Sequence, residues 1–404
     1  MALARVQTSD QSCGQQVEPR LGWFHRYPAR FHSDVLGQMF DGVEARLGRT
    51  PEIILDPFAG TGSTLSFAKQ QAISSVGVEL TPLGVLISNV RLNPIRDVNT
   101  AVNFAEEIAA VETAQPSHNF TPELVFWIGQ KNSLVLADYL NRIGRVRDTK
   151  LKRWLHLAVS SSLRPSSKWL VGSIKPQVDP QRKPSPIATH FLRCARILGR
   201  DCEAEWAGYQ KNTDSKVYRG DAQRLPLSDN SVESVITSPP YGTMYDYFDV
   251  HRLSYLAFGW KCDLQKQIGR PNHVECDGEG FKPPRHMAMW YREKFRAEVT
   301  LDGRALRAYF VAMRQHLREA KRVLKRGGVL AYAMANTFRN GGRFALAQAL
   351  ADVMRKLGFK EVELIRRENS HRRILPAGRD RQTGRFSSTA PEASVDEYLI
   401  FARR

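Results

Sequence analysis

Short apolar runs alternate with amphipathic stretches near the start of the chain, and this pattern predicts an α/β fold. Residues 52–56 form an apolar run typical of a buried strand, and residues 64–71 have the spacing of a helix. The same pair of patterns recurs at 75–79 and 83–92. A strand–helix–strand–helix order of this kind is the opening of a doubly wound sheet.

The alternation then stops and resumes later in the chain. Residues 100–215 are mostly helical in periodicity, and strands are again predicted at 216–220 and 232–237. A second interruption, residues 242–300, is aromatic and contains glycine and proline. The sequence therefore predicts one α/β sheet with two insertions, the first of them largely helical.

The C-terminal part completes the predicted sheet. Here the pattern predicts a helix at 302–323, a turn and strand at 327–333, a helix at 343–357, and strands at 359–365 and 397–402.

The charge balance suggests the kind of partner. Fifty-nine Lys and Arg face 41 Asp and Glu, so the formal net charge is +18. Such an excess favours a polyanion, nucleic acid first and an anionic membrane second. The excess is concentrated in residues 141–200, where 14 basic residues accompany two acids, Asp148 and Asp179.

Other features of the sequence favour a cytoplasmic protein. No apolar stretch approaches the roughly 20 residues that span a bilayer, and residues 1–20 are polar, loose and unlike a secretory signal. The five cysteines are scattered without a CxxC pair. This spacing argues against a disulfide scaffold or a zinc site and fits a reducing compartment. We expect no metal and no membrane partner.

The first predicted strand runs into a glycine-rich turn. Residues 55–65 read LDPFAGTGSTL and place Gly60 and Gly62 where a strand gives way to a helix. Small residues there let a ligand approach the backbone, and a helix N-terminus offers free N–H groups. The turn lacks the GxxxxGK(S/T) pattern of a phosphate loop, and Glu79 ends the second strand, where it can accept both hydroxyls of a ribose. The pattern predicts a nucleoside cofactor, with S-adenosylmethionine and a nicotinamide both open.

A corner with two prolines follows the strand at 232–237. Ser238, Pro239, Pro240 and Tyr241 come directly after the apolar run. The prolines remove two backbone donors and fix the local φ, so the loop is rigid and rich in acceptors. With an aromatic ring beside it, this corner suits a flat ligand that carries an NH2 group.

Together, the glycine turn and the corner resemble two motifs of the amino-methyltransferases, which methylate exocyclic NH2 groups of DNA bases. That family has DPFxGxGT and D/N/S-PP-Y/F/W; this chain has DPFAGTG at 56–62 and SPPY at 238–241. Weaker similarities are YPARFH at 27–32, GDA at 220–222 and LKRGGVLA at 324–331. The serine form of the second motif is commonest in the N4-cytosine branch.

The resemblance implies a fold and a domain organisation. The fold is a Rossmann-like class I methyltransferase sheet, mostly parallel with an antiparallel last strand, that carries the two insertions. The methyltransferase domain is discontinuous and comprises residues 21–99 and 216–404. Residues 100–215 are then a basic helical insertion, and residues 242–300 are a loop-rich candidate target-recognition region.

The resemblance also implies a reaction, methyl transfer from S-adenosylmethionine to N4 of a flipped-out cytosine. The catalytic residues would be Ser238, Pro239, Pro240 and Tyr241. Acceptors on the two N–H bonds of an amine free its lone pair for attack, and Ser238 Oγ and the Pro239 carbonyl can supply them. Tyr241 would stack on the base.

Cofactor binding is assigned by the same resemblance. Glu79 would hold the ribose and Asp221 the adenine amino group, while the glycine turn lines the methionine side. The full set is Tyr27, Phe31, Asp56, Phe58, Gly60, Gly62, Glu79 and Asp221.

The two insertions are expected to contact double-stranded DNA differently. Residues 242–300 leave from the carboxyl end of a strand, where ligands of open α/β sheets lie, so Trp260, Trp290 and Arg292 are candidates for base contacts. The basic insertion leads into a strand instead and would reach the base only by wrapping around the domain. Arg153 and Lys168 are therefore expected to contact phosphates.

Alternatives remain open at this stage. The same fold can make N6-methyladenine, although Ser238 favours cytosine. An RNA methyltransferase often has a binding module before the glycine motif, and only a short segment precedes it here. A catalytically silent nucleic-acid binder would not require an intact SPPY. A restriction endonuclease that acts on the same site is a further expected partner.

Overall fold

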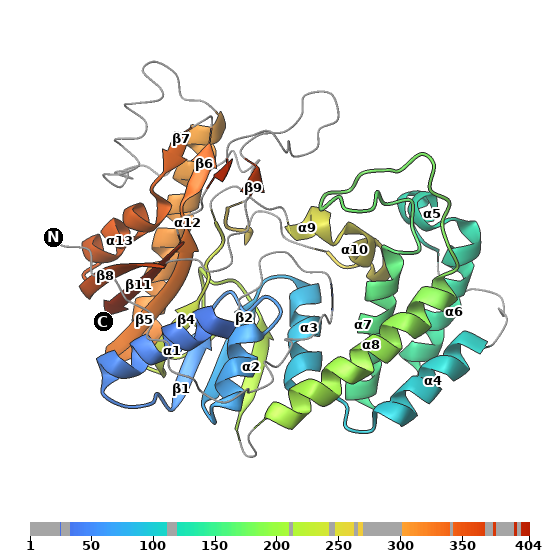
Figure 1. Cartoon of the computed structure of the whole chain (residues 1–404), viewed down its shortest axis with the longest axis horizontal. Helices are drawn as coiled ribbons and strands as arrows, with labels where there is room; N and C mark the ends of the chain where they lie inside the picture. Colours follow the sequence, from blue (N-terminus) through green and yellow to red (C-terminus); the bar gives the residue numbers. More distant parts are fainter. Residues whose placement is uncertain are drawn as a thin grey trace.

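The structure is a computed structural model of the whole chain. It describes residues 25, 33–110, 119–209, 213–241, 247–261, 266–269, 301–339, 342–367, 375–376, 392–393 and 397–404. Within these residues the chain forms an α/β part and a helical part that lie side by side (Figure 1).

The central sheet has the strand order β3-β2-β1-β4-β5-β11-β8 in the described part of the chain. Strand pairs are parallel from β3 to β5, whereas β11 is antiparallel to both β5 and β8. This arrangement is a Rossmann-like sheet, mostly parallel with an antiparallel last strand, as the sequence predicts. The strands are β1 (Ile53–Asp56), β2 (Ser74–Glu79), β3 (Ser215–Arg219), β4 (Val232–Thr237), β5 (Leu324–Ala335), β8 (Lys360–Arg367) and β11 (Glu397–Arg403).

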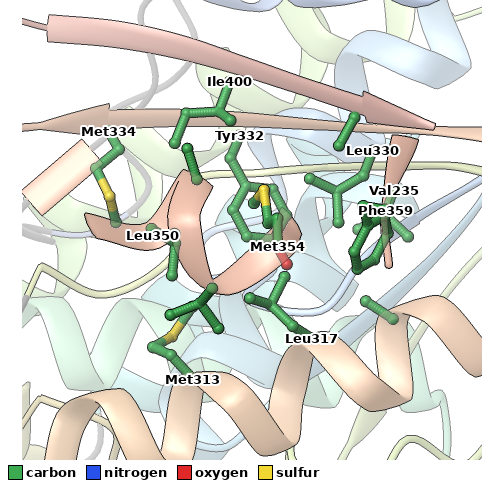
Figure 2. Packing of buried hydrophobic residues seen from close by; sticks show 14 of the residues in the cluster. Val235, Met313, Leu317, Leu330, Tyr332, Met334, Leu350, Met354, Phe359 and Ile400 are labelled. Carbon is green, nitrogen blue, oxygen red and sulfur yellow. The ribbon is translucent and has the colours of Figure 1, made fainter. Parts of the chain in front are cut away.

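Helices cover both faces of this sheet, so its central strands are buried on both sides. Successive side chains of a strand point to opposite faces. On β5, Leu330 and Tyr332 pack in the core formed with α12 and α13 (Figure 2), whereas Val329 and Ala331 pack in the core formed with α1 and α2. The covering helices are α1 (Ser33–Leu47), α2 (Ser63–Gln70), α12 (Leu301–Val323) and α13 (Leu346–Lys356).

The first insertion is helical, as its periodicity predicts, and it has a core of its own. Trp154 and Trp169 are fully buried there, and α3, which contributes Leu83, Ile87 and Val90 to this core, lies between the sheet and the other helices (Figure 1). We call this body the helical lobe. Its helices are α3 (Pro82–Leu92), α4 (Val98–Ala110), α5 (Pro122–Ile128), α6 (Gln130–Gly144), α7 (Thr149–Leu163) and α8 (Ile187–Gly208).

Part of the second insertion joins the helical lobe. The described helices there are α9 (Tyr247–Val250) and α10 (Arg252–Phe258). Leu253 and Ala257 of α10 belong to the buried core of the lobe. The two insertions therefore meet through apolar packing, and the helical lobe does not have to wrap around the sheet to approach the segment that follows Tyr241.

The remaining strands are short. The helix predicted at 343–357 starts at Leu346, because β7 (Gly342–Phe344) pairs with β6 (Thr337–Arg339) before the helix begins. A second small pair consists of β9 (Leu375–Pro376) and β10 (Glu392–Ala393). Among the described residues, no helix has the length and apolarity needed to cross a membrane.

Candidate active site

A pocket opens where the strands β1, β2, β3 and β4 end, which is where open α/β sheets bind ligands. Nine of the residues proposed from the sequence line it: Asp56, Phe58, Gly60, Glu79, Asp221, Ser238, Pro239, Pro240 and Tyr241. Gly62 lies in the same turn as Gly60. Tyr27 and Phe31 lie outside the described residues.

The glycine turn, residues 56–62, has a backbone that favours glycine. Gly60 and Gly62 have φ angles of 51° and 76°, in the left-handed region. Gly62 also caps the N-terminus of α2, and a Cβ atom there would lie 3.0 Å from Ser88 Oγ. Of the two glycines, Gly60 lines the pocket, where it presents backbone without a side chain.

Asp56 ends β1 and is almost fully buried. Its Oδ1 accepts hydrogen bonds from the Phe58 N–H (3.0 Å) and from Thr237 Oγ1 (2.5 Å). Burial raises the pKa of this carboxyl to about 6, although the hydrogen bonds oppose the shift. Thr237 is the last residue of β4, so this bond joins the glycine turn to the SPPY corner.

Glu79 connects the end of β2 to the same turn. One carboxylate oxygen accepts from the Gly60 N–H at 2.9 Å, and the other accepts from the N–H and the hydroxyl of Thr81 at 2.7 and 2.5 Å. Burial raises its pKa, while the bonds from Thr81 and Gly60 lower it. These bonds fix the carboxylate at the pocket wall, and Oε2, which accepts a single bond, retains a lone pair for a further donor.

A buried arginine behind the glycine turn was not found from the sequence. Arg91 of α3 donates to the Thr61 carbonyl and to Ser63 Oγ, both at 2.9 Å, and forms an ion pair with Glu205 of α8, with Nε and Oε1 3.0 Å apart. Both side chains are at most 3% exposed. The sequence did contain a signal for this residue: Arg91 is a charged residue within the apolar face of the helix predicted at 83–92.

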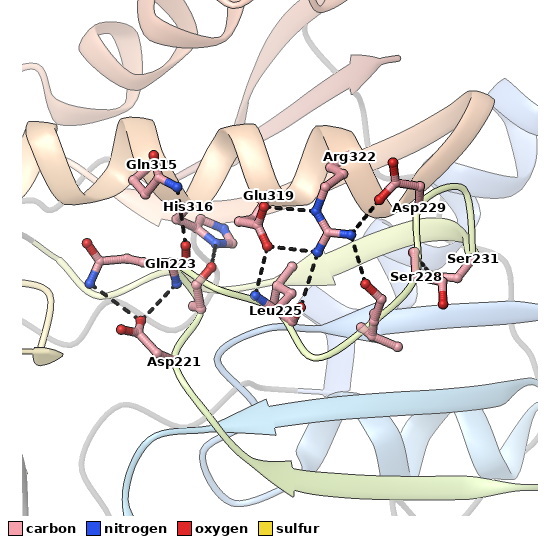
Figure 3. Close-up of polar contacts among 12 residues, drawn as sticks. Asp221, Gln223, Leu225, Ser228, Asp229, Ser231, Gln315, His316, Glu319 and Arg322 are labelled. Carbon is pink, nitrogen blue, oxygen red and sulfur yellow. Dashed lines mark hydrogen bonds and ion pairs between the residues drawn. The ribbon is translucent and has the colours of Figure 1, made fainter.

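The Asp221 loop, residues 220–231, connects β3 to β4 and rests on one face of α12 (Figure 3). Glu319 accepts from the Leu225 N–H at 2.9 Å, and Arg322 donates to the carbonyls of Leu225 and Leu227. Asp221 itself accepts from the Gln223 N–H at 2.8 Å. Side chains of α12 thus bond backbone groups of a loop that has little regular structure of its own.

His316 is the buried member of this helix face. Its Nδ1 lies 3.0 Å from the Ala222 carbonyl, its Nε2 contacts the Tyr332 hydroxyl, and its ring packs edge-on against Phe58, with centroids 4.7 Å apart. Burial lowers its pKa to about 4, so the ring is neutral at neutral pH. Because a carbonyl only accepts, Nδ1 carries the proton and Nε2 accepts from Tyr332. His316 therefore touches both Phe58 and the residue after Asp221.

The SPPY corner forms the opposite wall. Ser238 follows β4 directly, and its Oγ lies 3.5 Å from the Tyr241 hydroxyl, a long contact that leaves Oγ able to accept. Tyr241 packs at the edge of the core beneath the sheet. Four further pocket residues come from the second insertion, Tyr247, Lys266, Gln267 and Ile268, and the last three of them were not proposed from the sequence.

The residues proposed for DNA contact are dispersed over the helical lobe. Arg153 is exposed on α7. Lys168 is partly exposed, with Nζ 4.6 Å from the centroid of the Phe126 ring. Trp260 stacks on Phe258, with centroids 4.5 Å apart, and packs against the core of the lobe. Trp290 and Arg292 lie outside the described residues.

Comparison with known proteins gives one weak relative by sequence. No model of a known protein family matches the chain. The chain is similar to the type II methyltransferase M.BsoBI of Geobacillus stearothermophilus, at 24% identity over 307 residues that cover 67% of this chain. The chain spans 58% of the length of that relative.

Two solved structures are similar over most of the chain but superpose poorly. One is a SAM-dependent methyltransferase from Thermotoga maritima, with a TM-score of 0.30 and 12% identity, covering 91% of this chain and 88% of that one. The other is the 4+2 cyclase SpnF, with a TM-score of 0.33 and 12% identity, covering 93% and 83%. TM-scores this low carry no argument about the chain.

Proposed function

We propose that this protein is an S-adenosylmethionine-dependent DNA methyltransferase that transfers a methyl group to N4 of a flipped-out cytosine. One observation carries the proposal. The hydrogen bond from Thr237 to Asp56 joins the ends of β4 and β1, and so the glycine turn and the SPPY corner line one pocket. The two motifs that resemble the amino-methyltransferases are thus close enough to serve cofactor and base in a single reaction.

The wall of the pocket fits a nucleoside-bearing cofactor. The glycine turn leaves its backbone open to a ligand, and α2 begins there with N–H groups that a ligand can bond. Glu79 would accept the ribose hydroxyls, and Asp221 would accept from the adenine amino group. S-adenosylmethionine supplies an electrophilic methyl group, and the similarity to a type II methyltransferase supports this choice over a nicotinamide.

The SPPY corner would prepare the target amine. Ser238 Oγ and the Pro239 carbonyl would each accept one N–H bond, which favours a tetrahedral nitrogen with a free lone pair. Pro239 and Pro240 keep the corner rigid, so little reorganisation accompanies the reaction. Tyr241 would stack on the extruded base, whose target atom cannot be reached inside a duplex.

DNA is proposed as the substrate from motif and charge together. The serine of SPPY favours cytosine, and the basic helical lobe provides cations for phosphates. Because the relative is a type II methyltransferase, we also propose that a restriction endonuclease acts on the same DNA site.

Methyl transfer from tritiated S-adenosylmethionine tests this function directly. The chain should label double-stranded DNA and not RNA, and digestion of the DNA to nucleosides should place the label in N4-methylcytosine. Ser238→Ala should abolish the transfer and leave the affinity for S-adenosylmethionine nearly unchanged. Ser231→Ala is the matched control, because this serine lies just before the other end of β4 and its hydroxyl donates to the Ser228 carbonyl at 2.7 Å, in an exposed position.

Two results would contradict the proposal at different levels. Label in N6-methyladenine would support a DNA methyltransferase whose target base is adenine instead of cytosine, which is the alternative assignment. Absence of transfer to any DNA, or wild-type transfer by Ser238→Ala, would reject the catalytic assignment itself.

A further inference from the structure

A rigid hairpin projects from the helical lobe between α7 and α8. Residues 168–179 fold back on themselves, with the Leu170 N–H bonded to the Gln177 carbonyl and the Asp179 N–H to the Lys168 carbonyl, both at 2.8 Å. An antiparallel bridge between Trp169 and Val178 lies between these bonds. The segment is thus a loop closed by one antiparallel bridge, which we call the basic hairpin.

The base of the basic hairpin is anchored in the lobe. Trp169 is 1% exposed and packs against Trp127, with ring centroids 5.5 Å apart. Its indole N–H donates to the Ser173 carbonyl at 3.1 Å, and Arg182 donates to the carbonyls of Trp169 and Pro165 at 2.7 and 2.6 Å. These contacts hold the base of the basic hairpin against the lobe.

Its tip exposes apolar side chains. Val171 is 77% exposed and Ile174 is 40% exposed, and Phe126, beneath Lys168 at the base, is 50% exposed. Single exposed apolar residues need no explanation. Val178 of the same hairpin is 38% exposed, and four such residues on and beside one anchored segment indicate a surface that is covered by a partner.

The charge of the segment identifies the kind of partner. Residues 164–183 contain five basic residues and one acid. That acid, Asp179, accepts from the Gln181 N–H, whereas Lys175 and Lys183 are exposed. Lysines at the base and at the tip, together with the apolar groups at the tip, match duplex DNA, in which phosphates line a groove floored by base edges. The major groove is wide enough for an α-helix or a two-stranded ribbon, so a hairpin closed by one bridge can enter it.

The basic hairpin lies along the same edge of the lobe as a helix that lines the pocket, so one substrate can contact both. Tyr247 of α9 lines the pocket, and α10 follows it and is joined to α5 by an ion pair between Arg252 and Glu123. The hairpin rests on α5 through Trp127, and in Figure 1 α9 and α5 both lie along the upper edge of the helical lobe.

We propose that the basic hairpin inserts into the major groove of the DNA substrate, with Val171 and Ile174 against base edges and Lys168, Lys175 and Lys183 against phosphates. This inference rests on the proposed function for the identity of the partner. It goes beyond the phosphate contact expected of the basic insertion, because it gives this insertion base contacts of its own.

Binding of a short fluorescent duplex by the full chain, measured by anisotropy at several salt concentrations, tests the hairpin. Val171→Ser/Ile174→Ser should weaken binding by about tenfold, because apolar contact area is lost, and should leave the salt dependence unchanged. Lys175→Ala should lower the slope of log K against log salt by about 0.9. Leu134→Ser, an exposed aliphatic position on α6 (37% exposed), should bind like wild type.

The outcomes separate this inference from the proposed function. Wild-type affinity of the double serine variant, or an equal loss in Leu134→Ser, overturns the hairpin contact even if the protein methylates DNA. Binding of the wild-type chain to phosphatidylserine vesicles, with no binding to duplex DNA, overturns both the hairpin contact and the choice of substrate. Unchanged S-adenosylmethionine affinity of the double variant shows that it is folded.

Discussion

Arg91 and Glu205 form a buried ion pair that joins the glycine turn to the helical lobe. Their Nε and Oε1 atoms are 3.0 Å apart, and the remaining Arg91 donors hold Thr61 and Ser63. Glu205 lies on α8 and also accepts from Ser66 Oγ at 2.6 Å. The lobe proposed to grip DNA is thereby connected to the turn proposed to bind the cofactor.

We expect Glu205→Gln to lower the free energy of unfolding by about 3–5 kcal/mol, because it leaves a buried guanidinium without its counter-charge. Urea unfolding measures this. The control is Glu106→Gln on α4, which removes the exposed ion-pair partner of Arg196; Arg196 lies on α8, the helix that carries Glu205. This change should cost at most about 1 kcal/mol of unfolding free energy. Equal losses in the two variants would show that burial of the Arg91 pair has no energetic consequence.

Glu79→Gln should weaken S-adenosylmethionine binding by about 10- to 100-fold, the size expected when a charged acceptor of a hydrogen bond is lost. Isothermal titration calorimetry measures the affinity. Glu361→Gln is a suitable control, since that exposed carboxylate bonds Arg403 and does not line the pocket. An unchanged isotherm for Glu79→Gln would mean that Glu79 serves only to hold Gly60 and Thr81.

His316→Phe should destabilise the protein by about 1–3 kcal/mol, because the Ala222 carbonyl and the Tyr332 hydroxyl lose their buried partner. We also expect weaker cofactor binding, since the ring contacts Phe58 and holds the residue after Asp221. Gln315→Ala removes an exposed bond of 3.4 Å to the same loop and should change neither property. A fully stable His316→Phe variant with normal affinity would contradict this positioning role.

The pH dependence of stability should report the burial of Asp56. Its pKa is raised to about 6 in the folded protein, so the folded state favours the protonated acid. The stability that comes from this preference is present below about pH 4 and is lost as the pH rises through 6.

Asp56→Asn cannot ionise and should avoid this loss. Relative to wild type, it should gain about 3 kcal/mol between pH 4 and pH 8, as expected from a pKa shift of this size. Urea unfolding at several pH values provides the comparison. A difference that stays constant with pH would mean that the carboxyl has an ordinary pKa.

Arg153→Ala and Lys168→Ala should weaken binding to all DNA sequences similarly, and each should lower the salt slope by about 0.9. Anisotropy with two unrelated duplexes at several salt concentrations measures both effects. Glu106→Ala, which removes an exposed acid from α4 of the same lobe, should not lower the slope. If either basic variant changed which sequence is methylated, the lobe would read bases at these positions.

The sequence by itself determined the main strands and helices of the α/β part, the glycine turn and the SPPY corner. These features are local: apolar periodicity sets an element, a positive φ selects glycine at 60 and 62, and paired prolines stiffen residues 239 and 240. The carboxyl ends of neighbouring parallel strands then meet at one edge, which places Glu79 and Ser238 in one pocket.

Only the tertiary structure decided which distant residues support that pocket. A charged residue on an apolar helix face shows that a partner is needed, but the pairing of Arg91 with Glu205 depends on how α3 and α8 pack. His316 meets Ala222 for the same reason, through the packing of α12 on the sheet. Such contacts join segments far apart in the chain, and neither periodicity nor turn chemistry specifies them, because both describe only neighbouring residues.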